Sequence, residues 1–235
     1  MKKIVFLLIF GIQISFVSAQ EFVFSKQADL NSDNIIDKIS LTEIDGVFTL
    51  EINNFKTEIT FDDEDIDGFK IVDINKNDVF REIAVYASGP GGGSAFKLYY
   101  FDGKAIHFMN SLKDFPTFNG NGIVYVDNWE GFWKRRRKFV LNKQTHKLSE
   151  IEQFAFYVGV KNITVRNYVS IYSDEKLTKK TATLSKNSKI EILICKKDKN
   201  NYNNDLYLIK SKSGLIGWIK YSELEKNCSG FNFAG

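Results

Sequence analysis

The sequence contains very few cysteine, proline and histidine residues. Its 235 residues include two of each. Two cysteines can form at most one disulfide bond, so a small disulfide-rich fold is excluded and packed cores must stabilise the chain. An excess of charge of one sign is also missing, because 32 Lys and Arg residues nearly balance 29 Asp and Glu residues and leave a formal net charge of +3. We therefore expect no nucleic-acid partner, since nucleic-acid-binding domains are usually strongly basic.

Long apolar runs are missing except at the N-terminus. Lys2 and Lys3 precede an almost continuous apolar segment at 4–17, and small residues follow at 17–19. This order is typical of a secretory signal peptide cleaved after residue 19. An uncleaved membrane anchor is the alternative. We expect an exported protein, periplasmic or extracellular, with no transmembrane segment after cleavage.

Charge is distributed unevenly along the expected mature chain. Residues 20–100 carry a net charge of −9, residues 101–156 one of +3 and residues 157–235 one of +7. Such asymmetry is typical of two units with different surfaces. The expected division is a signal peptide, an N-terminal domain, a C-terminal domain and a short tail: 1–19, 20–156, 157–227 and 228–235.

The expected mature chain has β character throughout. No long stretch shows the 3.6-residue periodicity of an amphipathic helix, so we expect helices to be few and short. The dipeptides Asp45-Gly46 and Asp102-Gly103 are strong hairpin signals between apolar runs. The fold class is therefore predicted to be all-β, with early strands at 35–40, 47–52, 56–61, 83–87, 96–101 and 105–109.

An acidic loop in the N-terminal domain has the spacing of a calcium site. Asp29, Asn31, Asp33 and Asp37 place side-chain oxygens at positions 1, 3, 5 and 9, and the carbonyl of Ile35 at position 7 can complete the set. Hard oxygen ligands of this kind select Ca²⁺ over softer metals. The alternative is turn chemistry alone, since Asp and Asn side chains readily bond to nearby backbone amides.

A weaker copy of this pattern follows at Asp73, Asn75, Asp78 and Glu82. One residue is displaced relative to the first loop, so turn chemistry is favoured here and a calcium site is the alternative. The expected cofactor of the protein is Ca²⁺ with a structural role, held mainly by the first loop.

The pattern Asp-x-Asn-x-Asp-x-x-x-Asp before an apolar strand resembles the calcium loops of FG-GAP/VCBS-type repeats. The segments 72–75, 82–85 and 99–104 are similar to the same kind of exported module. The resemblance covers residues 26–150. It implies a β-meander or a partial propeller, since the chain is too short for a full propeller.

The C-terminal domain resembles a bacterial SH3-like domain, which is a small β-barrel. The matching segments are 183–193, 206–209, 217–219 and 223–224. Such domains are non-catalytic and some are similar to peptidoglycan-targeting modules, so the resemblance implies peptidoglycan, another cell-envelope polymer or an envelope protein as partner. Four aromatic side chains are candidates for binding a ligand: Tyr172, Tyr207, Trp218 and Tyr221. For Trp218 and Tyr207, the alternative is a core or half-buried position in the barrel.

The two cysteines, Cys195 and Cys228, both lie in the portion of the chain that we expect to be exported. Export to an oxidising compartment would permit a disulfide bond between them. Two free thiols, one of them buried in a strand, are the equally favoured alternative.

Catalytic signals are weak. Neither His107 nor His146 lies near a nucleophile motif, and the sequence contains no Gly-x-Ser-x-Gly or His-Glu-x-x-His. The basic run at 133–138 is interpreted as a strand with solvated Lys and Arg side chains. The sequence therefore predicts an exported, non-enzymatic binding protein stabilised by Ca²⁺. The alternative is an envelope hydrolase with its active site in residues 20–156.

Overall fold

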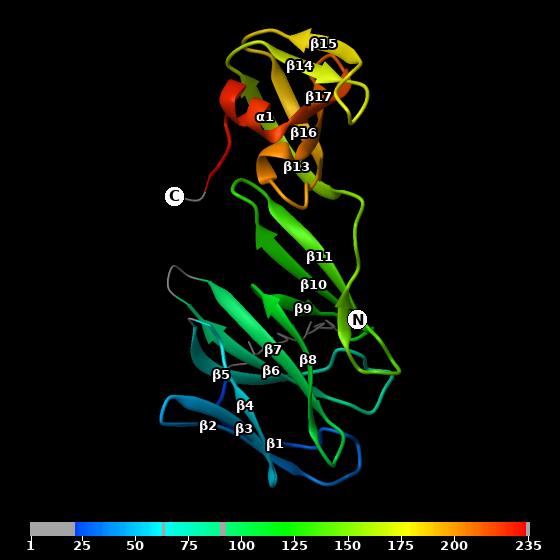
Figure 1. The fold of residues 1–235 in the computed structure, drawn as a ribbon. Coiled ribbons are helices and arrows are strands. Elements are labelled where there is room, and N and C mark those ends of the chain that lie inside the picture. The colour runs from blue at the N-terminus through cyan, green and yellow to red at the C-terminus, as the bar shows by residue number, and fades with distance from the viewer. Residues whose placement is uncertain (1–21, 63, 90–92, 234–235) are drawn as a thin grey trace, which may run out of the picture.

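A computed structural model describes residues 22–62, 64–89 and 93–233 of the chain (Figure 1). The expected signal peptide, residues 1–19, lies outside the described residues. Over these residues the fold is all-β, as the sequence predicts, with one short α-helix, α1 (Tyr221–Asn227), and a 3-10 helix, η2 (Tyr202–Asn204). Among the described residues, no helix has the length and apolar character needed to cross a membrane.

The first unit, which we define as residues 22–150, contains three antiparallel sheets, each a four-stranded meander. The first sheet is formed by β1 (Ser25–Ala28), β2 (Asp37–Ile44), β3 (Val47–Ile52) and β4 (Phe55–Ile59). The second is formed by β5 (Asp65–Val72), β6 (Glu82–Ser88), β7 (Ser94–Phe101) and β8 (Ile106–Lys113). The third is formed by β9 (Pro116–Phe118), β10 (Ile123–Trp129), β11 (Lys134–Leu141) and β12 (Leu148–Glu150).

Both hairpins expected from Asp-Gly dipeptides are confirmed. Asp45 and Gly46 join β2 to β3 with positive φ angles of 52° and 78°, which is the conformation that a type I′ turn requires. Gly103, with a φ of 87°, lies in the turn from β7 to β8. The local turn chemistry therefore sets these two strand pairings.

The middle sheet of the first unit is buried on both faces. From β6, Ile83 and Val85 pack against the first sheet, whereas Ala84 packs in the core shared with the third sheet. From β7, Tyr99 faces the first of these cores and Phe96 the second. Because successive side chains of a strand point to opposite faces, the continuous apolar runs of β6 and β7 serve two cores at once. The three sheets consequently follow one another along the molecule (Figure 1).

The C-terminal unit, residues 156–229, is one seven-stranded antiparallel sheet in the order β15-β14-β18-β17-β16-β13-β19. It begins at Phe156, next to the expected domain boundary. Its strands are β13 (Phe156–Val165), β14 (Val169–Tyr172), β15 (Lys180–Leu184), β16 (Lys189–Lys196), β17 (Leu206–Ser211), β18 (Ile216–Lys220) and β19 (Cys228–Ser229).

This sheet is not closed, so the prediction of a small closed barrel is wrong. Its edge strands, β15 and β19, do not pair with each other. Helix α1 covers this side of the core instead, since it contacts β14, β18 and β19 and buries Leu224 among the core residues. A helix thus shields apolar side chains where a strand pairing would close a barrel.

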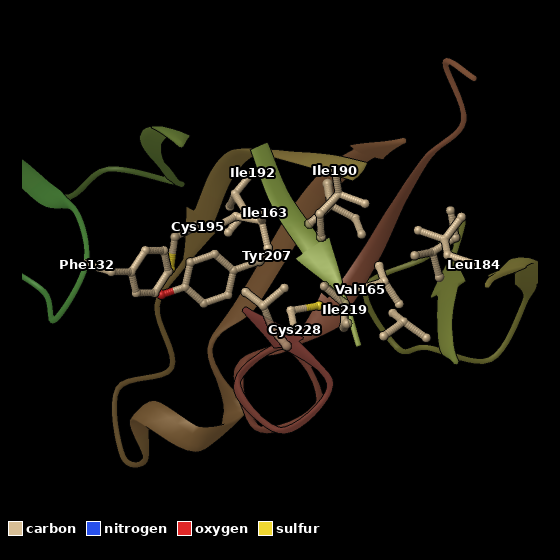
Figure 2. Packing of buried hydrophobic residues seen from close by; sticks show 14 of the residues in the cluster. Phe132, Ile163, Val165, Leu184, Ile190, Ile192, Cys195, Tyr207, Ile219 and Cys228 are labelled. Carbon is tan, nitrogen blue, oxygen red and sulfur yellow. The ribbon is translucent and has the colours of Figure 1, made fainter. Parts of the chain in front are cut away.

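A turn of the first unit is inserted into the core of the C-terminal unit. Phe132 and Trp133, between β10 and β11, are both buried in the cluster that contains Ile163, Cys195 and Tyr207. The indole Nε1 of Trp133 donates a hydrogen bond to the hydroxyl of Tyr207 at 3.2 Å. Figure 2 shows Phe132 beside Tyr207 and Cys195. The two units therefore share one core.

Replacing Trp133 with Ala should destabilise the protein by about 3–5 kcal/mol, the usual cost of truncating a buried Trp. Urea unfolding followed by circular dichroism measures this loss. The matched control is Trp129→Ala in the same hairpin, because Trp129 is 46% exposed and should cost about 1 kcal/mol at most. Equal losses in the two variants would contradict a stabilising role for the inserted turn.

Candidate functional site

The first acidic loop joins β1 to β2, and its side chains bond to the loop's own backbone. Asp29 accepts a hydrogen bond from the N–H of Asn34 at 3.0 Å, and Asp33 accepts one from the N–H of Ile35 at 2.8 Å. Asn31 donates through Nδ2 to Asp33 at 3.0 Å. Asn34 has a φ of 67°, the left-handed conformation that Asn tolerates. Turn chemistry thus accounts for these contacts.

Asp37, the last predicted ligand of the first loop, is 2% exposed and begins β2. Its Oδ2 accepts the N–H of Leu30 at 3.0 Å, and its Oδ1 accepts Nδ2 of Asn53 at 2.8 Å. A buried carboxylate is costly unless such donors compensate it. Asp37 therefore attaches the start of the loop to the sheet through fully partnered oxygens.

The second acidic loop repeats this arrangement between β5 and β6. Glu82 is 0% exposed, begins β6 as Asp37 begins β2, and accepts the N–H of Ile74 through Oε2 at 2.9 Å. Ile74 and Leu30 each follow the first Asp of their loop, and both are fully buried. The loops differ in one respect, because Oε1 of Glu82 and Oδ1 of Asp73 are buried without a hydrogen-bond partner.

The remaining predicted residues of the second loop bond to each other and to its backbone. Asn75 donates through Nδ2 to Asp78 at 2.7 Å, and Asp78 accepts the N–H of Phe80 at 3.0 Å. Burial raises the pKa of Glu82 from 4.5 to about 7, and the negative charges of Asp78 and Asp73 add to this rise. The second loop therefore buries negative charge without full compensation.

The two acidic loops are bonded to each other. The N–H of Arg81 donates to the carbonyl of Leu30 at 2.8 Å, and the hydroxyl of Ser32 donates to the carbonyl of Val79 at 2.9 Å. The first Asp of each loop also lines one shared cavity of about 820 Å³. Segments that lie far apart in the sequence thus form one continuous site.

A third loop, residues 119–122, continues this series and carries no acidic signal in the sequence. The N–H of Gly122 donates to the carbonyl of Ile74 at 2.7 Å, as Arg81 does to Leu30 in the preceding pair of loops. The carbonyl of Gly120 accepts the N–H of Lys76 at 3.0 Å. In the sequence, only the position of this loop after the first strand of a meander could have indicated its role.

Metal-binding geometry distinguishes the two acidic loops. Within the described part of the chain, no group of three or more His, Cys, Asp or Glu side chains is placed to hold a metal ion. The first-loop carboxylates already have protein donors. In the second loop, the partnerless oxygens of Asp73 and Glu82 are those that a hard cation would satisfy. The residues present therefore fit an ion better in the second loop, the reverse of the order favoured by the sequence.

The four aromatic candidates do not line a single groove. Tyr207 is buried in the C-terminal core, and Tyr221 stands beside it with the ring centroids 6.0 Å apart. Both line a cavity of about 390 Å³ at the junction of the two units. Tyr172 and Trp218 instead lie opposite each other as a cross-strand pair of β14 and β18.

Both cysteines are free thiols buried in the C-terminal core. Cys195 lies on β16 and Cys228 begins β19. Burial raises the pKa of the Cys195 thiol to about 12 and that of the Cys228 thiol to about 11. Neither group is a thiolate at neutral pH, so neither has the character of a catalytic nucleophile.

Both histidines lie against Tyr100. The rings of His107 and Tyr100 stack with centroids 4.7 Å apart, and the ring of His146 lies 5.0 Å from that of Tyr100. Nε2 of His107 is 2.8 Å from Oδ2 of Asp102. In the described residues, neither histidine side chain is hydrogen-bonded to a Ser, Thr or Cys side chain, as it would be in a base–nucleophile pair.

The basic run forms β11, as the sequence predicts, but its arginines are paired as well as solvated. Arg136 lies 2.6 Å from Asp127 of the neighbouring strand β10. Arg137 donates through Nε to Glu150 of β12 at 2.8 Å. Arg136 and Arg137 are therefore each paired with an acidic residue of a neighbouring strand.

Comparison of the chain with protein families, curated proteins and solved structures finds no match. The structure establishes an all-β protein of several antiparallel sheets.

Glu82→Gln should stabilise the protein near pH 8 in the presence of a chelator and have little effect near pH 4. The folded-state pKa of about 7 exceeds the ordinary value of 4.5, so the folded protein retains a proton that the unfolded chain loses between these values. The stabilisation from this proton is complete below the ordinary pKa and is lost as the pH rises through the folded-state pKa. The shift corresponds to about 3 kcal/mol.

Urea unfolding at the two pH values measures this difference. Glu58→Gln is the control, because Glu58 is exposed on β4 and its replacement removes no buried carboxylate. The same pH dependence in Glu82→Gln and in the unsubstituted protein would show that Glu82 is not the group responsible.

Proposed function

We propose that the chain is an exported, non-enzymatic binding protein whose acidic loops hold a structural Ca²⁺ ion and whose C-terminal unit attaches to peptidoglycan, another cell-envelope polymer or an envelope protein. The proposed ion site rests on two buried carboxylate oxygens, one on Asp73 and one on Glu82, that have no hydrogen-bond partner. The N-terminal signal pattern supports export. The resemblances to FG-GAP/VCBS-type and bacterial SH3-like modules support the same division of roles.

Calcium at the second loop would act on more than one sheet. The ion would compensate charge on Glu82, which begins β6, and on Asp73, which follows β5. The loop is bonded to the first acidic loop and to residues 119–122. An ion that binds only the folded state stabilises that state, so loading one loop would strengthen the contacts among all three sheets.

An envelope hydrolase has weaker support. The pair of Asp102 and His107 could orient a base, but the described residues give it no hydroxyl or thiol nucleophile within hydrogen-bond distance. The thiol of Cys195 has a pKa of about 12 and lies in the C-terminal core. The binding function therefore fits the observed side chains better.

Calcium should raise the melting temperature of the mature protein, and a chelator should lower it. At a concentration about a hundredfold above its dissociation constant, the ion should add about 2.7 kcal/mol. The double variant Asp73→Asn/Glu82→Gln should lose this response, whereas Asp29→Asn/Asp33→Asn should keep it. Differential scanning calorimetry measures each case.

Two outcomes of the calorimetry decide the ion site. A melting temperature that changes with neither calcium nor chelator would refute the proposed calcium site. A response lost only in Asp29→Asn/Asp33→Asn would assign the ion to the first loop, as the residue spacing of that loop predicts.

The mature protein should co-sediment with purified sacculi, and soluble sacculus fragments should release it. The whole mature chain is needed because Phe132 and Trp133 complete the core of the C-terminal unit. Protein that stays in the supernatant would exclude the wall polymer and leave an envelope protein as partner.

A further inference from the structure

We propose that the cavity at the junction of the two units binds one sugar ring of a neutral oligosaccharide. This inference rests on the proposed attachment to an envelope polymer and names the site and the ligand class. The cavity has a volume of about 390 Å³, and it draws its walls from both units. It is lined by Trp129, Glu130, Gly131, Lys197, Tyr202, Asp205, Tyr207 and Tyr221.

Aromatic rings stand on both walls of this cavity. Trp129 closes β10 of the first unit and is 46% exposed. Tyr202 is 63% exposed and lies beside Tyr221 of the C-terminal unit, with centroids 5.9 Å apart. Exposed aromatic side chains offer large flat apolar faces with a polar edge. The C–H faces of a sugar ring fit between such surfaces.

The charged groups of the cavity are paired with one another and with Arg135, which lies outside the cavity lining. Nζ of Lys197 lies 2.8 Å from Glu130 and 2.7 Å from Asp205. Glu130 also forms an ion pair with Arg135, whose Nε lies 2.8 Å from its Oε1. Two acidic and two basic side chains therefore form one connected network. A charged ligand would have to break these ion pairs. A neutral ligand can instead form hydrogen bonds to the paired side chains without separating them.

The network is also well fixed in place. The Asp205 side chain is 3% exposed and accepts the N–H of Asp198 at 2.8 Å through its second oxygen. Hydroxyl groups can both donate to carboxylates and accept from an ammonium group. A concave site with aromatic walls and a few fixed polar groups is the usual form of a small-ligand site. These features together select a neutral polyhydroxylated ligand.

Isothermal titration calorimetry with chitotetraose and cellotetraose, two uncharged oligosaccharides, tests the proposal on the mature protein. At least one should bind, and Trp129→Ala and Tyr202→Ala should each weaken binding by about tenfold. Tyr168→Ala is the control, because Tyr168 is an exposed aromatic residue (74%) that does not line the cavity, and it should leave affinity unchanged. Affinity should be the same at low and high salt.

Three results would overturn the site: no heat of binding with either sugar at millimolar concentration, equal affinity in Trp129→Ala and Tyr168→Ala, or a strong loss of affinity at high salt. Sacculus co-sedimentation separates this failure from failure of the proposed function. If Trp129→Ala protein sediments with sacculi as tightly as the unsubstituted protein, attachment to the polymer stands and the junction cavity is excluded as its site.

Discussion

The two units are held together by a shared core, and the junction depends on it. Phe132 and Trp133 belong to a hairpin of the first unit but are buried with residues of the C-terminal sheet. Glu130 of the same turn pairs with Lys197, so apolar burial and charge pairing act at one place. The junction cavity requires the inserted turn, because Glu130 and Gly131 form part of its lining.

Within the first unit, coupling between sheets takes a different form. A buried carboxylate at the start of a second strand accepts a backbone N–H from the loop before it, as Asp37 and Glu82 do. The carbonyl of the same loop residue then accepts an N–H from the next meander. The backbone polar groups of buried Leu30 and Ile74 are thereby satisfied at two neighbouring sheets. Charge placed in one loop consequently affects the packing of its neighbours.

The sequence was sufficient for the β class and for hairpins with strong turn chemistry, because Asp45-Gly46 and alternating side chains act locally. It was not sufficient for the inserted turn, since the burial of Trp133 depends on Tyr207, far along the chain. Barrel closure also failed as a prediction, because strand propensity does not show that Leu224 of a helix will cover the core. For the acidic loops, residue spacing located the segments but could not show which oxygens lack donors.

The loop at 119–122 shows how the series of meanders ends. Leu30 and Ile74 stand two positions after the first strand of their sheets, and Gly120 stands two positions after the third such strand. Gly120 has a φ of 69°, and a Cβ atom there would come within 2.8 Å of the Lys76 side chain. With neither a side chain to bury nor a following carboxylate at this position, the third meander lacks the buried residue and the carboxylate that connect each earlier loop to its sheet. An apolar side chain at residue 120 could be buried only if the side chain of Lys76 moved away.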